Sequence, residues 1–381
     1  MKHIIAYLQV VFLLFASCTI EKKESRIDES KTIKNKIDSL GNRYLELGRF
    51  SGTIAIADKD AILYKQSFGL ADYENNIKFS DKTAFKIGEL SQLITYEIFQ
   101  GLIKMGKLKS SETILLYTNG KTSKIKIQDI LRDSIFSIDY KILDGIIRQT
   151  TGRSFESNVQ NYSELLGLEN TFYDKKTDNL AKGYTNQNID GNGLTLQPAT
   201  TYNINEAFSN SGIKSTALDL LKILKSKKDT IEIEGYMEDD GFSYAVANNL
   251  DEKYAIVILS NRRHPIADEM MNSIECILSD KKYTLPLARK PFSIDSKLLG
   301  DFTGNYVINE KVNFEVIQEN DSLYILLGNQ KVNIIPQSQN QFYMNDRDAA
   351  MRFIRNSNNQ VDKVELLNGF IQSDQIAWKS Q

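Results

Sequence analysis

The side chains best suited to chemistry stand together in residues 87–92, IGELSQ, just before a run of apolar residues at helical spacing. An acyl-transfer hydrolase needs a hydroxyl nucleophile, a base with a lowered pKa and hydrogen-bond donors for the oxyanion. Glu89 could attack an acyl group only by forming an anhydride, and the amide of Gln92 is not basic enough to take a proton. A carboxylate in the first turn of a helix is stabilised by the helix dipole, by about 0.3–1 kcal/mol. We therefore expect Glu89 to have a structural role.

Two further candidates for a serine hydrolase site fail on their context. Residues 241–245, GFSYA, approach the pattern G-x-S-x-G, but they lack the last glycine and lead into a strand, whereas a nucleophile elbow ends one. Ser91 is followed three residues later by Ile94, where a lysine base would be needed. A Ser-His-Asp triad would have to use His264, in a proline-containing turn. Since the other histidine is His3, a site with several histidines is excluded, and we expect no metal and no cofactor.

Apolar periodicity predicts the elements that must position these residues. Residues 89–105 form the helix that follows the candidate segment. The other expected helices cover 33–47, 139–150, 216–225 and 266–278, and the expected strands cover 52–57, 61–66, 244–247 and 254–260. Strands near both ends of this region enclose the internal helices, an arrangement typical of layered α+β and α/β structure. We therefore expect an α+β domain, layered like an α/β protein.

The pattern changes after Pro286 and Pro291. From there on, short runs of alternating apolar and polar residues are separated by turn residues. The expected strands cover 301–306, 314–318, 323–327, 332–335, 341–344 and 351–354. Such regular short strands predict an all-β sandwich or small barrel.

Residues 85–92, FKIGELSQ, resemble the segment F-x-I-G-S-x-S-K of the β-lactamase-related serine hydrolase family, which includes class C β-lactamases, penicillin-binding proteins and D-alanyl-D-alanine carboxypeptidases. Other stretches resemble family landmarks in their usual order, at 50–52, 106–108, 151–155, 166–171, 181–184, 211–220 and 255–261. The resemblance implies a β-lactamase/transpeptidase-like domain, with an antiparallel sheet flanked by helices, and the family's usual small C-terminal β domain. The expected boundaries are 33–285 for the first domain and 293–381 for the second.

The same resemblance implies that the catalytic motifs are lost. The family carries a serine with a lysine three residues later, then Y-x-N, then K-T-G or H-x-G. In this chain the corresponding residues are Glu89 and Gln92, Phe136 and Ile138, and Gly235 and Met237. Removing a nucleophile or base from a catalytic unit typically lowers turnover by about 10⁶-fold, so we expect no catalytic residue at these positions. The acidic residues 238–240 would also repel anionic ligands such as penicillins at short range.

The N-terminus has the features of a targeting segment. Lys2 precedes a short apolar run at 4–15, and residues 15–18, FASC, resemble a bacterial lipobox whose cysteine receives lipid. The apolar run is shorter than the roughly 18 residues that a spanning helix needs. The charged residues that follow suit a solvated tether. The expected division is a lipoprotein signal peptide at 1–17, lipid attachment at Cys18, and a tether at 18–32.

These features predict a catalytically inactive lipoprotein of the bacterial cell envelope, periplasmic or on the outer membrane, that binds a protein or a peptidoglycan ligand. The net charge of −2 gives no support for nucleic-acid binding. An alternative is a hydrolase with a rewired site, in which Glu89 acts as acid or base and Ser209 or Ser211 supplies a hydroxyl. A third possibility is that the C-terminal β domain carries the function by binding lipid or a partner.

Overall fold

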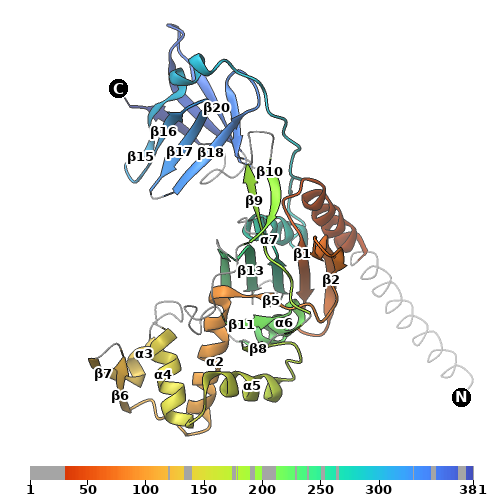
Figure 1. Ribbon diagram of the computed structural model, residues 1–381, viewed down its shortest axis with the longest axis vertical. Helices are drawn as coiled ribbons and strands as arrows, with labels where there is room; N and C mark the ends of the chain where they lie inside the picture. Colours follow the sequence, from red (N-terminus) through yellow and green to blue (C-terminus); the bar gives the residue numbers. More distant parts are fainter. Residues whose placement is uncertain are drawn as a thin grey trace, which may run out of the picture. The chain divides into compact units, whose positions relative to one another are not determined.

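The computed structural model divides the chain into two compact units, Met1–Tyr283 and Thr284–Gln381 (Figure 1). The structure describes residues 31–118, 121–132, 140–173, 177, 179–188, 194–199, 212–227, 230–237, 240–249, 254–262, 266–328, 330–344, 349–367 and 375–380. Several residues singled out in the sequence lie outside these ranges: Cys18, Phe136, Ile138, Ser209, Ser211, Glu238, Asp239 and His264. Within the described ranges, no helix combines the length and the apolar character needed to cross a bilayer.

The first unit is built on a five-stranded antiparallel sheet. Its strand order is β12 (Ile231–Met237), β13 (Phe242–Asn249), β14 (Tyr254–Ser260), β1 (Gly52–Ala57) and β2 (Ile62–Phe68). Both faces of the central strands are covered. Ala55 and Ala57 contribute to the core on one face, whereas Ile54 and Ile56 pack into the core on the other. This explains why the central strands are apolar almost throughout, because residues on both faces of a strand are buried.

Helices cover both faces of this sheet, so the predicted α+β fold is confirmed. One face packs against the helix over residues 31–46 and α7 (Ile266–Leu278). The core on the other face includes side chains of α2 (Ser91–Lys104), α3 (Ile127–Arg132), α4 (Tyr140–Thr151), α5 (Phe155–Leu166) and α6 (Ala217–Lys225). Small sheets complete the unit: β3 (Leu70–Asp72) with β4 (Ile77–Lys78), β6 (Thr113–Thr118) with β7 (Lys121–Lys126), β9 (Tyr184–Asn188) with β10 (Leu194–Pro198), and β5 (Phe85–Lys86) with β11 (Ile213–Ser215) and β8 (Phe172–Tyr173).

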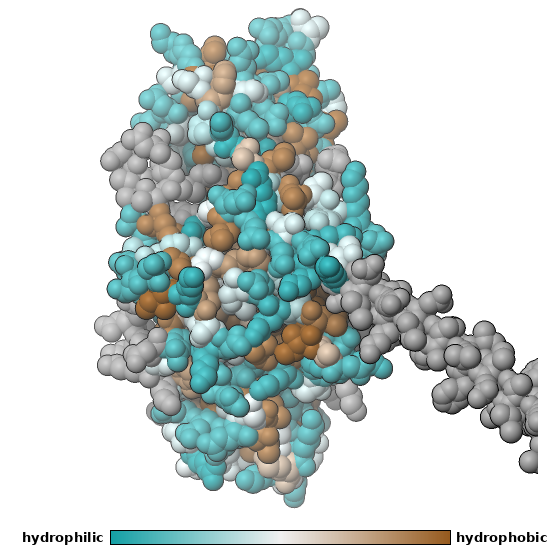
Figure 2. Space-filling view, turned by 90° about the vertical axis from the view of Figure 1, so that its right-hand side faces the viewer, coloured by the Kyte–Doolittle hydropathy of each residue, from teal (hydrophilic) through white to brown (hydrophobic). Residues whose placement is uncertain are grey.

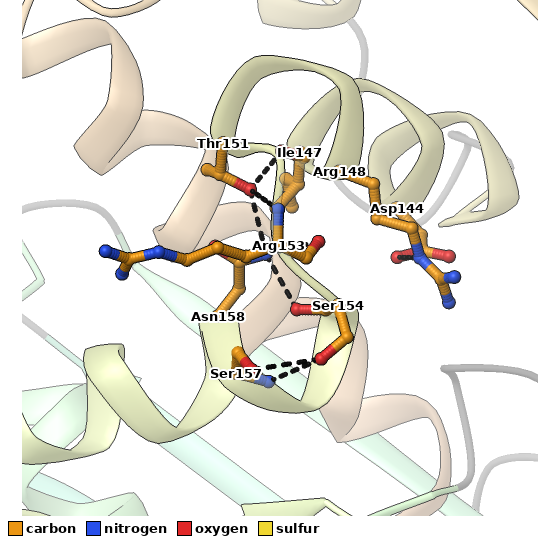
Figure 3. A network of polar contacts seen from close by, with 8 residues as sticks. All are labelled: Asp144, Ile147, Arg148, Thr151, Arg153, Ser154, Ser157 and Asn158. Carbon is orange, nitrogen blue, oxygen red and sulfur yellow. Dashed lines mark hydrogen bonds and ion pairs between the residues drawn. The ribbon is translucent and has the colours of Figure 1, made fainter.

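The junction between α4 and α5 shows how one family landmark works as structure (Figure 3). The Asn158 side chain donates to Thr151 Oγ1 at 3.1 Å and to the Ser154 carbonyl at 2.9 Å. The Ser154 hydroxyl in turn accepts the Ser157 backbone N–H and caps α5. At its other end α5 stops at Gly167, which has φ +62°, a left-handed conformation that glycine adopts at little cost. Residues 151–155 therefore fix the angle between two helices.

The second unit is a closed antiparallel barrel, which resolves the choice between sandwich and barrel. After the 3₁₀ helix η3 (Ser296–Phe302), its strands follow chain order: β15 (Gly304–Asn309), β16 (Val312–Glu319), β17 (Ser322–Leu327), β18 (Gln330–Pro336), β19 (Gln341–Met344), β20 (Ala350–Arg355), β21 (Val361–Leu367) and β22 (Ile376–Lys379). Arg289 and Phe292 precede the expected start at 293, yet they hydrogen-bond to Gln337 and to the Pro336 carbonyl. The chain therefore joins the barrel before its first strand.

Aromatic side chains occupy the interior of the barrel. Phe302, Tyr306, Phe342 and Phe353 are at most 1% exposed, and their ring centroids lie 4.9–5.7 Å apart in the contacting pairs. Small eight-stranded barrels are filled either by side chains or by one small ligand. The described part of this barrel is of the filled kind.

The surface mixes apolar and polar side chains. On the face seen in Figure 2, hydrophobic residues form small patches separated by hydrophilic ones. Single exposed apolar side chains are normal on folded proteins. Apolar exposure alone therefore marks no binding site here.

Candidate functional site

The candidate site lies at the head of α2, where a short turn joins β5 to the helix. Strand β5 is held by antiparallel pairing with β11, which sets Lys86 opposite Lys214. Gly88 then adopts φ +49°, and residues Gly88–Leu90 form a single 3₁₀ turn, η1. Ile87 and Leu90 are fully buried, whereas Glu89 between them is exposed. The turn therefore anchors its apolar side chains in the core and leaves the Glu89 side chain exposed, two residues before α2 begins at Ser91, so Glu89 lies outside the first turn of that helix.

Tyr244 fills the space beside this turn. In the antiparallel register of β12 and β13, Tyr244 is the direct partner of Gly235. A Cβ atom at Gly235 would lie only 2.5 Å from Tyr244 Oη, and one at Gly88 would lie 3.1 Å from Tyr244 Cε1. The Met237 side chain lies equally close to Gly88. The phenol ring therefore crosses β12 at Gly235, and it reaches Gly88 in the turn before α2.

The hydroxyl of Tyr244 accepts a hydrogen bond from the backbone of the turn before α2. Glu89 N–H donates to Tyr244 Oη at 3.2 Å. Burial of the ring, with the nearby Glu89 carboxylate, raises the pKa of the Tyr244 phenol above its ordinary range, so the phenol is protonated at neutral pH and is no base. The Glu89 N–H therefore already has a hydrogen-bond partner within the chain.

An ion pair lies at the rim of the site. The Lys86 ammonium contacts the Asp240 carboxylate, and the two side chains are 13% and 17% exposed. Asp240 belongs to the acidic stretch 238–240 that was expected to repel anionic ligands. Because Lys86 balances its charge, Asp240 contributes less to that repulsion than the sequence implied.

Two serine hydroxyls of this region are sealed from solvent. Ser91, the first residue of α2, is fully buried, and Ser243 is 2% exposed. Neither hydroxyl has a hydrogen-bond partner in the described part of the chain, and the same is true of Gln92 Oε1. Ser243 lies inside β13, as expected from its sequence context. Neither serine is presented as a nucleophile elbow would present it.

Asn261 is a structural residue that the sequence flagged only as part of a landmark. It is completely buried, and its amide nitrogen donates to the carbonyls of Leu70, Ala71 and Lys182 at 2.9–3.3 Å. The backbone carbonyl of Asn261 accepts the Tyr184 N–H at 3.0 Å. Residues 70–71 and the landmarks at 181–184 and 255–261 are therefore joined at one buried residue.

Asp219 likewise connects two segments of the chain through buried hydrogen bonds. Its carboxylate accepts the backbone N–H of Asn170 at 2.8 Å and the hydroxyl of Thr171 at 3.0 Å. Thr171 also hydrogen-bonds to Ser215 at 2.7 Å. The landmarks at 166–171 and 211–220 are thus joined by a buried polar network.

Within the described residues, no cluster of three histidine, cysteine or acidic side chains could hold a metal ion.

The ionisation of Asp72 makes the stability of the region around Asn261 depend on pH, because Lys182 and Tyr184 contact both residues. Burial raises the pKa of the Asp72 carboxyl, but hydrogen bonds from Asn75, the charge of Lys182 and the Tyr184 hydroxyl outweigh burial and lower it. The ionised carboxylate therefore stabilises the fold above the unfolded pKa of about 3.9, and this contribution is lost as the pH falls through the lower folded pKa. We expect Asp72→Asn to destabilise the protein at pH 7 by less than about 1 kcal/mol, since the carboxylate is partly exposed. In urea unfolding curves the difference should shrink as the pH falls below the unfolded pKa; a difference that stays equal from neutral to acidic pH would contradict this assignment.

The fold of this chain was compared with solved structures, and it is similar to those of penicillin-binding proteins and their homologues. The octameric penicillin-binding protein homologue from Pyrococcus abyssi superposes with a TM-score of 0.51 at 17% identity, covering 90% of this chain and 99% of that one. FmtA from Staphylococcus aureus superposes with a TM-score of 0.50 at 18% identity, covering 68% and 92%. The chain thus has the β-lactamase and penicillin-binding-protein fold, and the resemblance seen in the sequence is confirmed.

Sequence comparison finds relatives in the same superfamily, although no family model matches the chain. Penicillin-binding protein 4* of Bacillus subtilis (strain 168) is 23% identical over 119 residues, which is 30% of this chain and 26% of that protein. The teichoic acid D-alanine hydrolase of Staphylococcus aureus is 26% identical over 187 residues, 38% of this chain and 47% of that protein. The match thus spans between about a quarter and about half of the length of these relatives.

Proposed function

We propose that this chain is a catalytically inactive relative of the β-lactamase-type serine hydrolases and acts by binding a protein or a cell-wall ligand. The observation that carries the proposal is the Tyr244 side chain, which lies between Gly235 and Gly88 and accepts the Glu89 N–H. A hydrolase of this type needs that space for a base and that N–H for the oxyanion. With Glu89 and Gln92 at the serine and lysine positions, the nucleophile and its base are replaced as well.

The class of partner follows from the relatives, which are named for penicillin binding and for teichoic acid. Both names refer to the bacterial cell envelope. Binding and bond cleavage depend on different groups, so a fold can keep a recognition surface after its chemistry is lost. We therefore place the partner among peptidoglycan fragments and envelope proteins. Cosedimentation of the purified chain with peptidoglycan sacculi tests the first of these, and its absence would favour a protein partner.

Covalent labelling tests the proposed inactivity. We expect neither a fluorophosphonate probe nor a fluorescent penicillin to modify the chain, with Penicillin-binding protein 4* as the labelled control. The double variant Glu89→Ser/Gln92→Lys should also remain unlabelled, because Tyr244 still holds the oxyanion donor and Gly235 supplies no base. Mass spectrometry of the intact protein measures the adduct. Modification of any serine in the unaltered chain would end the proposal.

The rewired hydrolase remains the competing proposal, with Glu89 as acid or base. The exposed carboxylate of Glu89 is open to contact with a ligand. The hydroxyls of Ser91 and Ser243 are buried. Esterase or amidase turnover that Glu89→Gln abolishes would favour this competing proposal over binding.

We also propose that the chain is anchored by lipid at Cys18, in keeping with an envelope location. The support is the FASC segment after a short apolar run. Cys18→Ser should prevent incorporation of radiolabelled palmitate and shift the protein from the membrane fraction of cells, because lipidation of the thiol is what would hold it there. The matched control is Cys276→Ser, which should change neither readout. Palmitate incorporation that persists in Cys18→Ser would contradict the anchor.

A further inference from the structure

A strongly basic surface is formed by the end of α2, the turn after it and the hairpin of β6 and β7. Figure 1 shows this hairpin at the edge of the first unit, beside α3 and α4. Between positions 104 and 132 the acidic residues are Glu112 and Asp129, and the basic residues are Lys104, Lys107, Lys109, Lys121, Lys124, Lys126 and Arg132. The whole chain has a net charge of −2. Positive charge is therefore concentrated locally, although the overall composition hides it.

Five of these lysines are exposed and stand on one short supersecondary unit: Lys104, Lys107, Lys109, Lys124 and Lys126. None of the five ammonium groups forms an ion pair with a carboxylate of the described chain. The neighbouring Glu112 carboxylate accepts the backbone N–H of Lys109 at 3.2 Å, so it caps a turn. The hairpin register places Thr113 beside Lys126, which keeps the turn at 109–112 next to the strand. The positive charge of this surface is thus largely uncompensated by its surroundings.

Two apolar side chains of the same segment are also exposed. Met105 follows the last residue of α2 and is 59% exposed, and Leu115 on β6 is 55% exposed. Leu115 is the direct cross-strand partner of Lys124. An exposed apolar side chain gains free energy only when it enters an apolar phase. A soluble polyanion would use the lysines alone, whereas a bilayer with anionic lipids would use both kinds of side chain.

We infer that this basic surface, residues 104–118 and 121–126, docks the domain onto an anionic lipid bilayer. Lysines meet the lipid phosphates, and Met105 and Leu115 enter the boundary between headgroups and acyl chains. The inference does not depend on the inactivity proposed for the head of α2. It adds a second membrane contact to any N-terminal anchor and would hold one edge of the domain against the membrane.

A fluorescent reporter on the hairpin separates this contact from binding by the N-terminus. The full-length chain carries Leu115→Trp together with Trp378→Phe, which removes the one natural tryptophan. We expect a blue shift with vesicles of phosphatidylglycerol and phosphatidylcholine, and none with phosphatidylcholine alone or with soluble polyphosphate. The shift should diminish between 0.1 and about 0.5 M NaCl, because salt screens the lysine charges.

Lysine variants complete the test. Lys124→Gln/Lys126→Gln in the reporter chain should weaken the vesicle-induced shift about 25-fold in lipid concentration, at about fivefold per lysine. The matched control Lys59→Gln/Lys82→Gln removes the same charge from exposed positions elsewhere and should behave like the parent. The inference is overturned by an unshifted spectrum with anionic vesicles, by an equal shift with neutral ones, by a shift with polyphosphate alone, or by equal effects of the two variants.

Discussion

Truncating Tyr244 to alanine is expected to lower the free energy of unfolding of the first unit by about 3–5 kcal/mol, the usual cost of removing a buried aromatic ring. Tyr244 is 2% exposed and packs between β12 and the turn before α2. Tyr244→Phe keeps the ring and loses only the hydrogen bond from Glu89 N–H, so it should cost about 0.5–1.5 kcal/mol. Urea unfolding followed by far-ultraviolet circular dichroism measures both values. Equal costs would mean that the ring does not fill this space.

Gly235 provides the second half of this experiment. Gly235→Ala should cost about 1–3 kcal/mol in the parent chain, because its Cβ would lie 2.5 Å from Tyr244 Oη. In the Tyr244→Ala background the clash is absent, and alanine is the better strand residue by about 0.5–1 kcal/mol. The same substitution should then be neutral or stabilising. A cost of Gly235→Ala that is unchanged in the two backgrounds would show that the residues do not interact.

The Tyr244–Gly235 pair also marks the limit of sequence reasoning at the site. The loss of serine and lysine can be read directly from Glu89 and Gln92, because they follow a recognisable segment. The identity of the residue that fills the resulting space cannot be read from the sequence in the same way. Tyr244 meets Gly235 only through the register of β12 and β13, and the chain between Met237 and Phe242 permits more than one register. A glycine in the middle of a strand, close in sequence to a large aromatic residue, was the available signal.

The fold was more accessible to sequence analysis than the site. Helix α6 and strand β14 have strong periodicity, and both were predicted within a residue of their ends. Helix α5 was missed because asparagine, glutamine and serine interrupt its apolar pattern, although the caps at Ser154 and Gly167 could have revealed it. Strand β21 was missed because its burial does not alternate regularly. Weak periodicity hides an element whose position depends on tertiary packing.

The second large effect is expected from a substitution inside the barrel, and the fluorescence of Trp378 can be used to measure it. Phe353 is fully buried, and its ring contacts Phe302, Tyr306 and Phe342. Phe353→Ala should lower the free energy of unfolding of the barrel by about 3–5 kcal/mol, because the closed sheet cannot collapse onto the lost ring. Trp378 on β22 is the one tryptophan of the sequence, so its fluorescence reports this unit during urea unfolding.

Ile376→Ala is the matched control for Phe353→Ala. Ile376 lies on the same strand as Trp378 but is 45% exposed on the outer face of the barrel. Its truncation should cost less than about 1 kcal/mol, because little apolar area returns to water and no cavity forms. If Phe353→Ala moved the fluorescence midpoint no more than Ile376→Ala, the aromatic interior would not be the source of barrel stability.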